Sequence, residues 1–62
     1  MFTKEELDEA LRAIHSTISK CEKVMPKLKQ GSPQQTLLIR RIKAFQVASI
    51  LINEALEKLP RT

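Results

Sequence analysis

The sequence predicts an all-α fold: an antiparallel two-helix hairpin, coiled-coil-like, that pairs into a dimeric four-helix bundle. Three observations favour this fold. Apolar residues in the first half alternate at four- and three-residue spacing, helix-start signals occur twice, and the second half is more apolar than one partner helix can cover. The 62 residues are expected to form a single helical-hairpin domain, 1–62.

The regular spacing in the first half defines one narrow stripe, which we call the seam. An α-helix carries residues of this spacing on one side, where they face a partner helix. The seam consists of Leu7, Leu11, Ile14, Ile18, Cys21, Met25 and Leu28.

The first helix has a well-marked start. Thr3 and Glu6 have the spacing of a capping box, in which each side chain bonds the other residue's backbone amide. Phe2 before the cap and Leu7 at the fourth helical position have the spacing of a hydrophobic staple. The first helix is therefore expected to begin at about residue 4.

The end of the first helix leaves two alternatives. Pro26 has no amide hydrogen to donate and clashes with the preceding turn of a helix. Either the helix ends near Met25, followed by one short turn to Gln30, or it kinks at Pro26 and continues. We expect the kink and a helix over about 4–30, because Leu28 keeps the seam in phase.

The second helix is expected to follow almost at once. Gly31 ends the first helix, and Ser32, Pro33 and Gln35 read as a cap, a first helical residue and the partner of a second capping box. A turn over 30–32 makes the two helices antiparallel neighbours. The second helix is expected to span about 33–59, stopped by Pro60.

The second helix carries more apolar surface than a hairpin can bury. One stripe faces the seam and consists of Leu38, Ile42, Phe45, Ile52, Leu56 and Leu59, interrupted by Ser49. The other apolar residues are the expected dimer and partner interface. The expected dimer contact is Leu37, Ala44, Ala48, Leu51 and Ala55, and the remaining surface for a partner is Ile39, Val47 and Ile50. The simplest way to cover them is a homodimer, and the alternative is a larger, unidentified protein partner.

Charge is unevenly distributed along the chain, whose formal net charge is +4. The segment from Lys20 to Lys43 carries seven basic residues and one acidic residue, a net +6, which leaves −2 for the rest. This segment could contact an acidic protein or nucleic acid. The candidate contacts are Lys23, Lys27, Arg40, Arg41 and Lys43. Nucleic acid is the less favoured partner, because Phe2 and Phe45 are the chain's only aromatic residues for base stacking.

No catalytic residue, metal site, cofactor or small-molecule substrate is expected. Cys21 and His15 are the nearest approach to a nucleophile and base, but six residues on a helix turn them about 120° apart. The longest uncharged stretch, Ala44 to Asn53, is too short to span a bilayer. The charged N-terminus and lone cysteine indicate a cytoplasmic protein without a signal peptide. The sequence thus predicts a non-enzymatic protein–protein interaction, adaptor or regulatory module, with nucleic-acid binding as the alternative.

Overall fold

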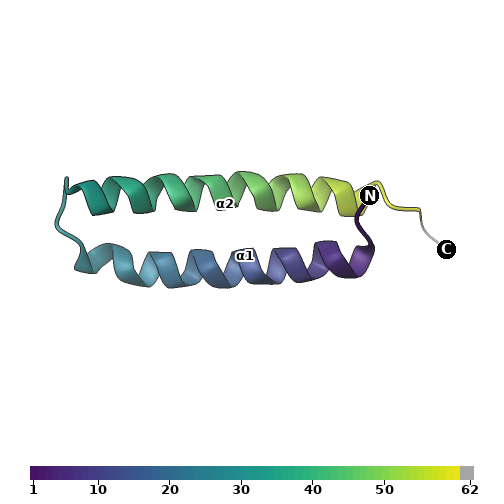
Figure 1. Ribbon diagram of the computed structural model, residues 1–62, viewed down its shortest axis with the longest axis horizontal. Helices are drawn as coiled ribbons and strands as arrows, with labels where there is room; N and C mark the ends of the chain where they lie inside the picture. The colour runs from purple at the N-terminus through teal and green to yellow at the C-terminus, as the bar shows by residue number, and fades with distance from the viewer. Residues whose placement is uncertain (61–62) are drawn as a thin grey trace.

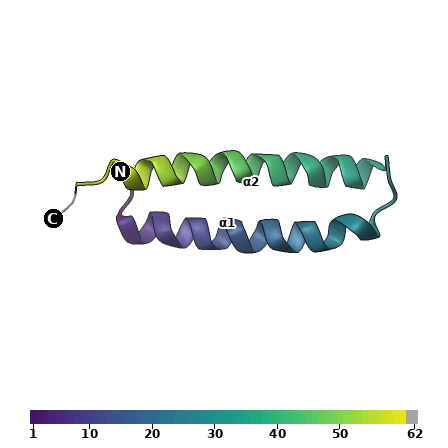
Figure 2. The same cartoon turned by 180° about the vertical axis from the view of Figure 1, so that it is seen from behind.

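The computed structural model describes residues 1–60, in which two α-helices lie side by side and antiparallel (Figure 1). The first helix, α1, spans Lys4–Val24 and the second, α2, spans Pro33–Glu57, with a short 3₁₀ turn, η1, over Met25–Lys27. The hairpin is a rod with extents of 50 × 14 × 14 Å. The loop forms one end, here called the tip, and the N-terminus lies at the opposite, open end (Figure 2).

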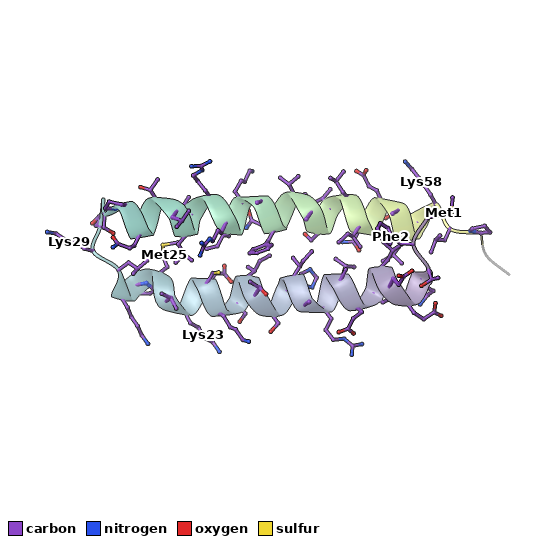
Figure 3. The ribbon with its side chains drawn as sticks, viewed as in Figure 1. Met1, Phe2, Lys23, Met25, Lys29 and Lys58 are labelled. Carbon is purple, nitrogen blue, oxygen red and sulfur yellow. The ribbon has the colours of Figure 1, made fainter. Side chains whose placement is uncertain are left out.

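The seam packs against α2 as the spacing predicts. All seven seam residues are buried or half-buried, and Figure 3 shows Met25 between the two helices. On α2, the facing stripe is half-buried along its whole length, including Ser49. The Ser49 hydroxyl donates to the Gln46 carbonyl at 2.8 Å, so its polar group is bonded within its own helix.

The expected start of α1 is confirmed. The Thr3 hydroxyl accepts from the Glu6 amide at 3.1 Å, and the Glu6 carboxylate accepts from the Thr3 amide at 2.9 Å. Two amides that the helix itself cannot satisfy are thereby bonded.

The expected continuation of the first helix to residue 30 with a kink at Pro26 is wrong. The α-helix ends at Val24, and Pro26 lies in the 3₁₀ turn that follows. Because proline lacks an amide hydrogen, it cannot continue the α-helical ladder. Leu28 is already extended, with φ −90° and ψ 144°, yet it stays half-buried. A single 3₁₀ turn therefore keeps the seam in phase, which the spacing alone does not distinguish from a longer α-helix.

The loop is also longer than the expected turn over 30–32, because the chain leaves the helix earlier. The Ser32 amide donates to the Lys29 carbonyl at 3.0 Å, which closes a tight turn around Gln30 and Gly31. Gly31 has φ +80°, the left-handed conformation that the third position of a type II turn requires.

The second capping box is confirmed on one side only. The Ser32 hydroxyl accepts from the Gln35 amide at 3.2 Å, as expected. The Gln35 side chain, however, accepts from the Gly31 amide at 2.8 Å instead of the Ser32 amide. The reason is the loop turn, which already uses the Ser32 amide as a donor.

The second helix ends two residues before its expected limit at residue 59. The Lys58 amide donates to the carbonyls of both Glu54 and Ala55 at 3.2 Å, and the Leu59 amide donates to Leu56 at 3.2 Å. The bonds to Ala55 and Leu56 are of the i→i−3 type and tighten the last turn just before Pro60.

Candidate functional site: an apolar face along both helices

The hairpin buries very little of its apolar surface. Among residues 1–60, Leu7 is the only buried side chain, with 7% of its surface exposed. Large aliphatic side chains on α2 stay in contact with solvent: Leu37, Ile39, Val47, Ile50 and Leu51. Exposed apolar groups of this size on a small protein are typical of an interaction surface.

The apolar residues of α2 outside the packed stripe fall into two groups around the helix. One group precedes each seam-facing residue by one position, so it lies about 100° to one side of the packed stripe. Its members are Leu37, Ala44, Ala48, Leu51 and Ala55. Ile39 and Ile50 follow the packed stripe and lie on the opposite flank, while Val47 points away from α1 between the two groups.

The first helix contributes to the same side of the hairpin. When two α-helices pack antiparallel, the residues directly before the contact positions of each helix lie on the same side of the pair. On α1 the uncharged residues at those positions are Ala10, Ala13, Thr17 and Val24. Ala10 and Thr17 of α1 are half-buried, as are Ala48 and Ala55 of α2, which agrees with a shared flank.

We call this combined surface the apolar face. It comprises Ala10, Ala13, Thr17 and Val24 of α1 together with Leu37, Ala44, Ala48, Leu51 and Ala55 of α2. Small side chains predominate, so a second helix layer could approach the backbone closely. Thr17 does not disturb the apolar character, because its hydroxyl donates to the Ala13 carbonyl at 2.8 Å.

The α1 half of this face was not among the expected interface residues. The sequence does contain the pattern that marks these α1 residues, since each of the four comes directly before a seam residue. Alanine and threonine are too common in helices for that position to be noticed without knowing the direction of the partner helix. The residues expected as a separate partner surface, Ile39, Val47 and Ile50, lie outside the apolar face.

The basic residues do not form one surface. Lys23 lies on the side of α1 that faces away from α2, and Lys29 extends from the tip (Figure 3). Lys27 lies in η1, directly before the seam residue Leu28, whereas Arg40 and Lys43 lie on α2 away from α1. Arg41 comes directly before Ile42 of the packed stripe, so it lies within the apolar face, as Lys20 before Cys21 does on α1. The five expected nucleic-acid contacts are therefore spread around the rod.

An apolar hollow lies at the open end, where the N-terminal residues meet the end of α2. Its volume is about 480 Å³, and it is lined by Met1, Phe2, Leu7, Ala55, Lys58, Leu59 and Pro60. Phe2 and Leu7, the expected staple, both line it, but Phe2 stays 68% exposed. The sequence gives no spacing signal for this hollow, because it depends on how the two ends of the chain meet.

The polar groups considered for chemistry lie apart from this hollow. Cys21 is half-buried in the seam and His15 is exposed on α1. Within residues 1–60, no three histidine, cysteine or acidic side chains gather as metal ligands would. Neither helix has a segment of sufficient length and apolarity to cross a membrane.

No family model, curated protein or solved structure matches this chain.

Proposed function

We propose that this chain is a non-enzymatic protein–protein interaction module that self-associates through its apolar face into a homodimeric four-helix bundle. One observation carries the proposal: a single side chain among residues 1–60 is buried, while Leu37 and Leu51 lie exposed on one face. A hairpin this small gains too little from its own core to leave such a face in water.

Self-association suits the shape of the face. A two-fold dimer contains two copies of the face. Each leucine of the sequence therefore becomes buried in both copies, so that two side chains are buried for each leucine position. Burial of a leucine is worth about 1.5–3 kcal/mol. The alternating small residues on both helices would let the two layers approach at the 8–10 Å that is usual for packed helices.

The proposal is tested with a pair of neighbouring residues. Leu51 lies on the apolar face and is 59% exposed, whereas Ile50 lies on the opposite flank and is 58% exposed. Leu51→Glu and Ile50→Glu therefore make the same change in charge and start from the same exposure. Sedimentation equilibrium over a range of concentrations measures the association of each variant.

We expect the parent chain and Ile50→Glu to be dimers, and the dimer of Leu51→Glu to be weaker by at least about 100-fold, since two charges would be buried. Circular dichroism at high protein concentration checks that the helices persist. A parent chain that stays monomeric would contradict the proposal, as would a Leu51→Glu dimer of unchanged affinity.

A further inference from the structure

The charge distribution bears on how two such hairpins would be oriented. The segment from Lys20 to Lys43 contains the end of α1, the loop and the start of α2, so its net +6 lies in the tip half of the rod. Residues 1–19 and 44–60, which form the open half, carry three basic and six acidic residues, a net −3. The rod is 50 Å long, so its two ends are several Debye lengths apart at physiological salt.

A face-to-face dimer with two-fold symmetry has two possible orientations. If the two-fold axis runs along the rod, the tips lie together and two segments of +6 face each other. If the axis lies across the rod, each tip lies beside the partner's open end. Because salt screens charges beyond about 8–10 Å, the halves that lie side by side decide the electrostatic energy. Only the second orientation places opposite charges there.

We infer that the apolar face binds a second copy of this chain tip to open end, so that α2 packs antiparallel against α2 of the partner copy. This inference rests on the proposed self-association and adds its geometry. The occupant follows from charge: the surface that best complements this rod, basic at one end and acidic at the other, is the same rod reversed.

The register of the hairpin indicates which charges would meet. Leu7 and Ala55 line the same hollow, so α1 and α2 positions at one height have numbers that add up to about 62. Residues 4–28 therefore lie beside residues 34–58, and the middle of this overlap is Gln46. A two-fold axis at that height places Arg40 of one copy about two residues, or roughly 3 Å along the rod, from Glu54 of the other, within reach of the arginine side chain.

The orientation is measured with a spin label at the tip. Lys29 is exposed in the loop and extends away from both helices (Figure 3), so Lys29→Cys carries the label in a Cys21→Ala background. Dipolar spectroscopy then measures the distance between the two labels of a dimer. Unlabelled Cys21→Ala serves as the control for folding and association.

In the tip-to-open-end dimer the labels should lie about 40–50 Å apart, close to the length of the rod. With tips together they should lie within roughly 20 Å, since packed helices are 8–10 Å apart. A dimer with the short distance would overturn the orientation and leave the proposed self-association intact. A monomer in sedimentation would overturn both.

Charge reversal provides a second, independent test. Arg40 and Glu54 are 14 residues apart on α2, about 21 Å, so they do not contact each other within one chain. Arg40→Glu and Glu54→Arg should each weaken the dimer by roughly 3- to 10-fold, and the double variant should recover most of the affinity. Strictly additive losses would contradict the pairing.

Discussion

The two helices have similar lengths but distribute their apolar residues differently. In α1, of 21 residues, the large apolar side chains lie on the seam, apart from Val24. In α2, of 25 residues, large apolar side chains occur on the seam-facing side and on both flanks. One neighbouring helix can cover the large apolar side chains of α1, whereas those of α2 need more covering surface than the hairpin provides. The difference indicates that α1 mainly stabilises the fold and α2 mainly supplies the surface for association.

The largest expected effect contrasts one leucine from each helix. Leu7→Ala should lower the free energy of unfolding by about 2 kcal/mol, because it leaves a cavity beside the end of α2. Leu51→Ala should cost little in dilute protein and should remove stability only at concentrations where the parent chain dimerises. Urea unfolding at several protein concentrations separates the two. If the two variants lost the same free energy of unfolding at low protein concentration, Leu51 would stabilise the single hairpin. That result would contradict the assignment of α2 to association.

The helix starts show how far the sequence allows prediction. Capping depends on residues three apart, so the Thr3 box could be predicted in full. The Ser32 box could be predicted only in half, because the Gln35 side chain responds to a loop whose turn engages the Ser32 amide. Short-range signals are predictable when nothing distant competes for the same donor.

The candidate site was less predictable than the fold for a related reason. The α2 part of the apolar face was visible as a surplus of leucine and alanine. The α1 part has small residues apart from Val24, and its membership depends on the antiparallel direction of the neighbouring helix. The end of α1 could not be derived from periodicity, since three residues of 3₁₀ helix leave Leu28 on the same side as a continuing α-helix would.

A smaller effect is expected from the two caps. Ser32→Ala should destabilise the hairpin by about 1 kcal/mol, and Thr3→Ala by about half as much. The bond from the Gln35 amide is partly buried, so water cannot easily replace the lost hydroxyl. The bond from the Glu6 amide is exposed, and water can replace it. Thermal unfolding of both variants, with Ser16→Ala as an exposed mid-helix control, measures the order, and the reverse order would contradict this account.

The smallest effect concerns an ion pair within α1. The Lys4 ammonium donates to the Asp8 carboxylate at 2.7 Å, one helical turn away, and the two side chains are 69% and 44% exposed. The hydrogen bond, and then the charge, of Asp8 raise the pKa of Lys4 above its ordinary value.

A raised pKa means that the folded chain holds this proton more tightly than the unfolded chain. The resulting stabilisation is complete below pH 10.5, the ordinary value for lysine, and is lost as the pH rises through the raised pKa. Asp8→Asn should therefore lower the pKa of Lys4, which NMR titration of the Lys4 side chain measures. Glu9→Gln is the control, because it removes a neighbouring charge and leaves the hydrogen bond between Lys4 and Asp8 in place. Between pH 6 and 9 the melting temperature of Asp8→Asn should match that of Glu9→Gln, because solvent screens exposed pairs. A clear loss specific to Asp8→Asn would mean that α1, too, depends on contacts outside the seam.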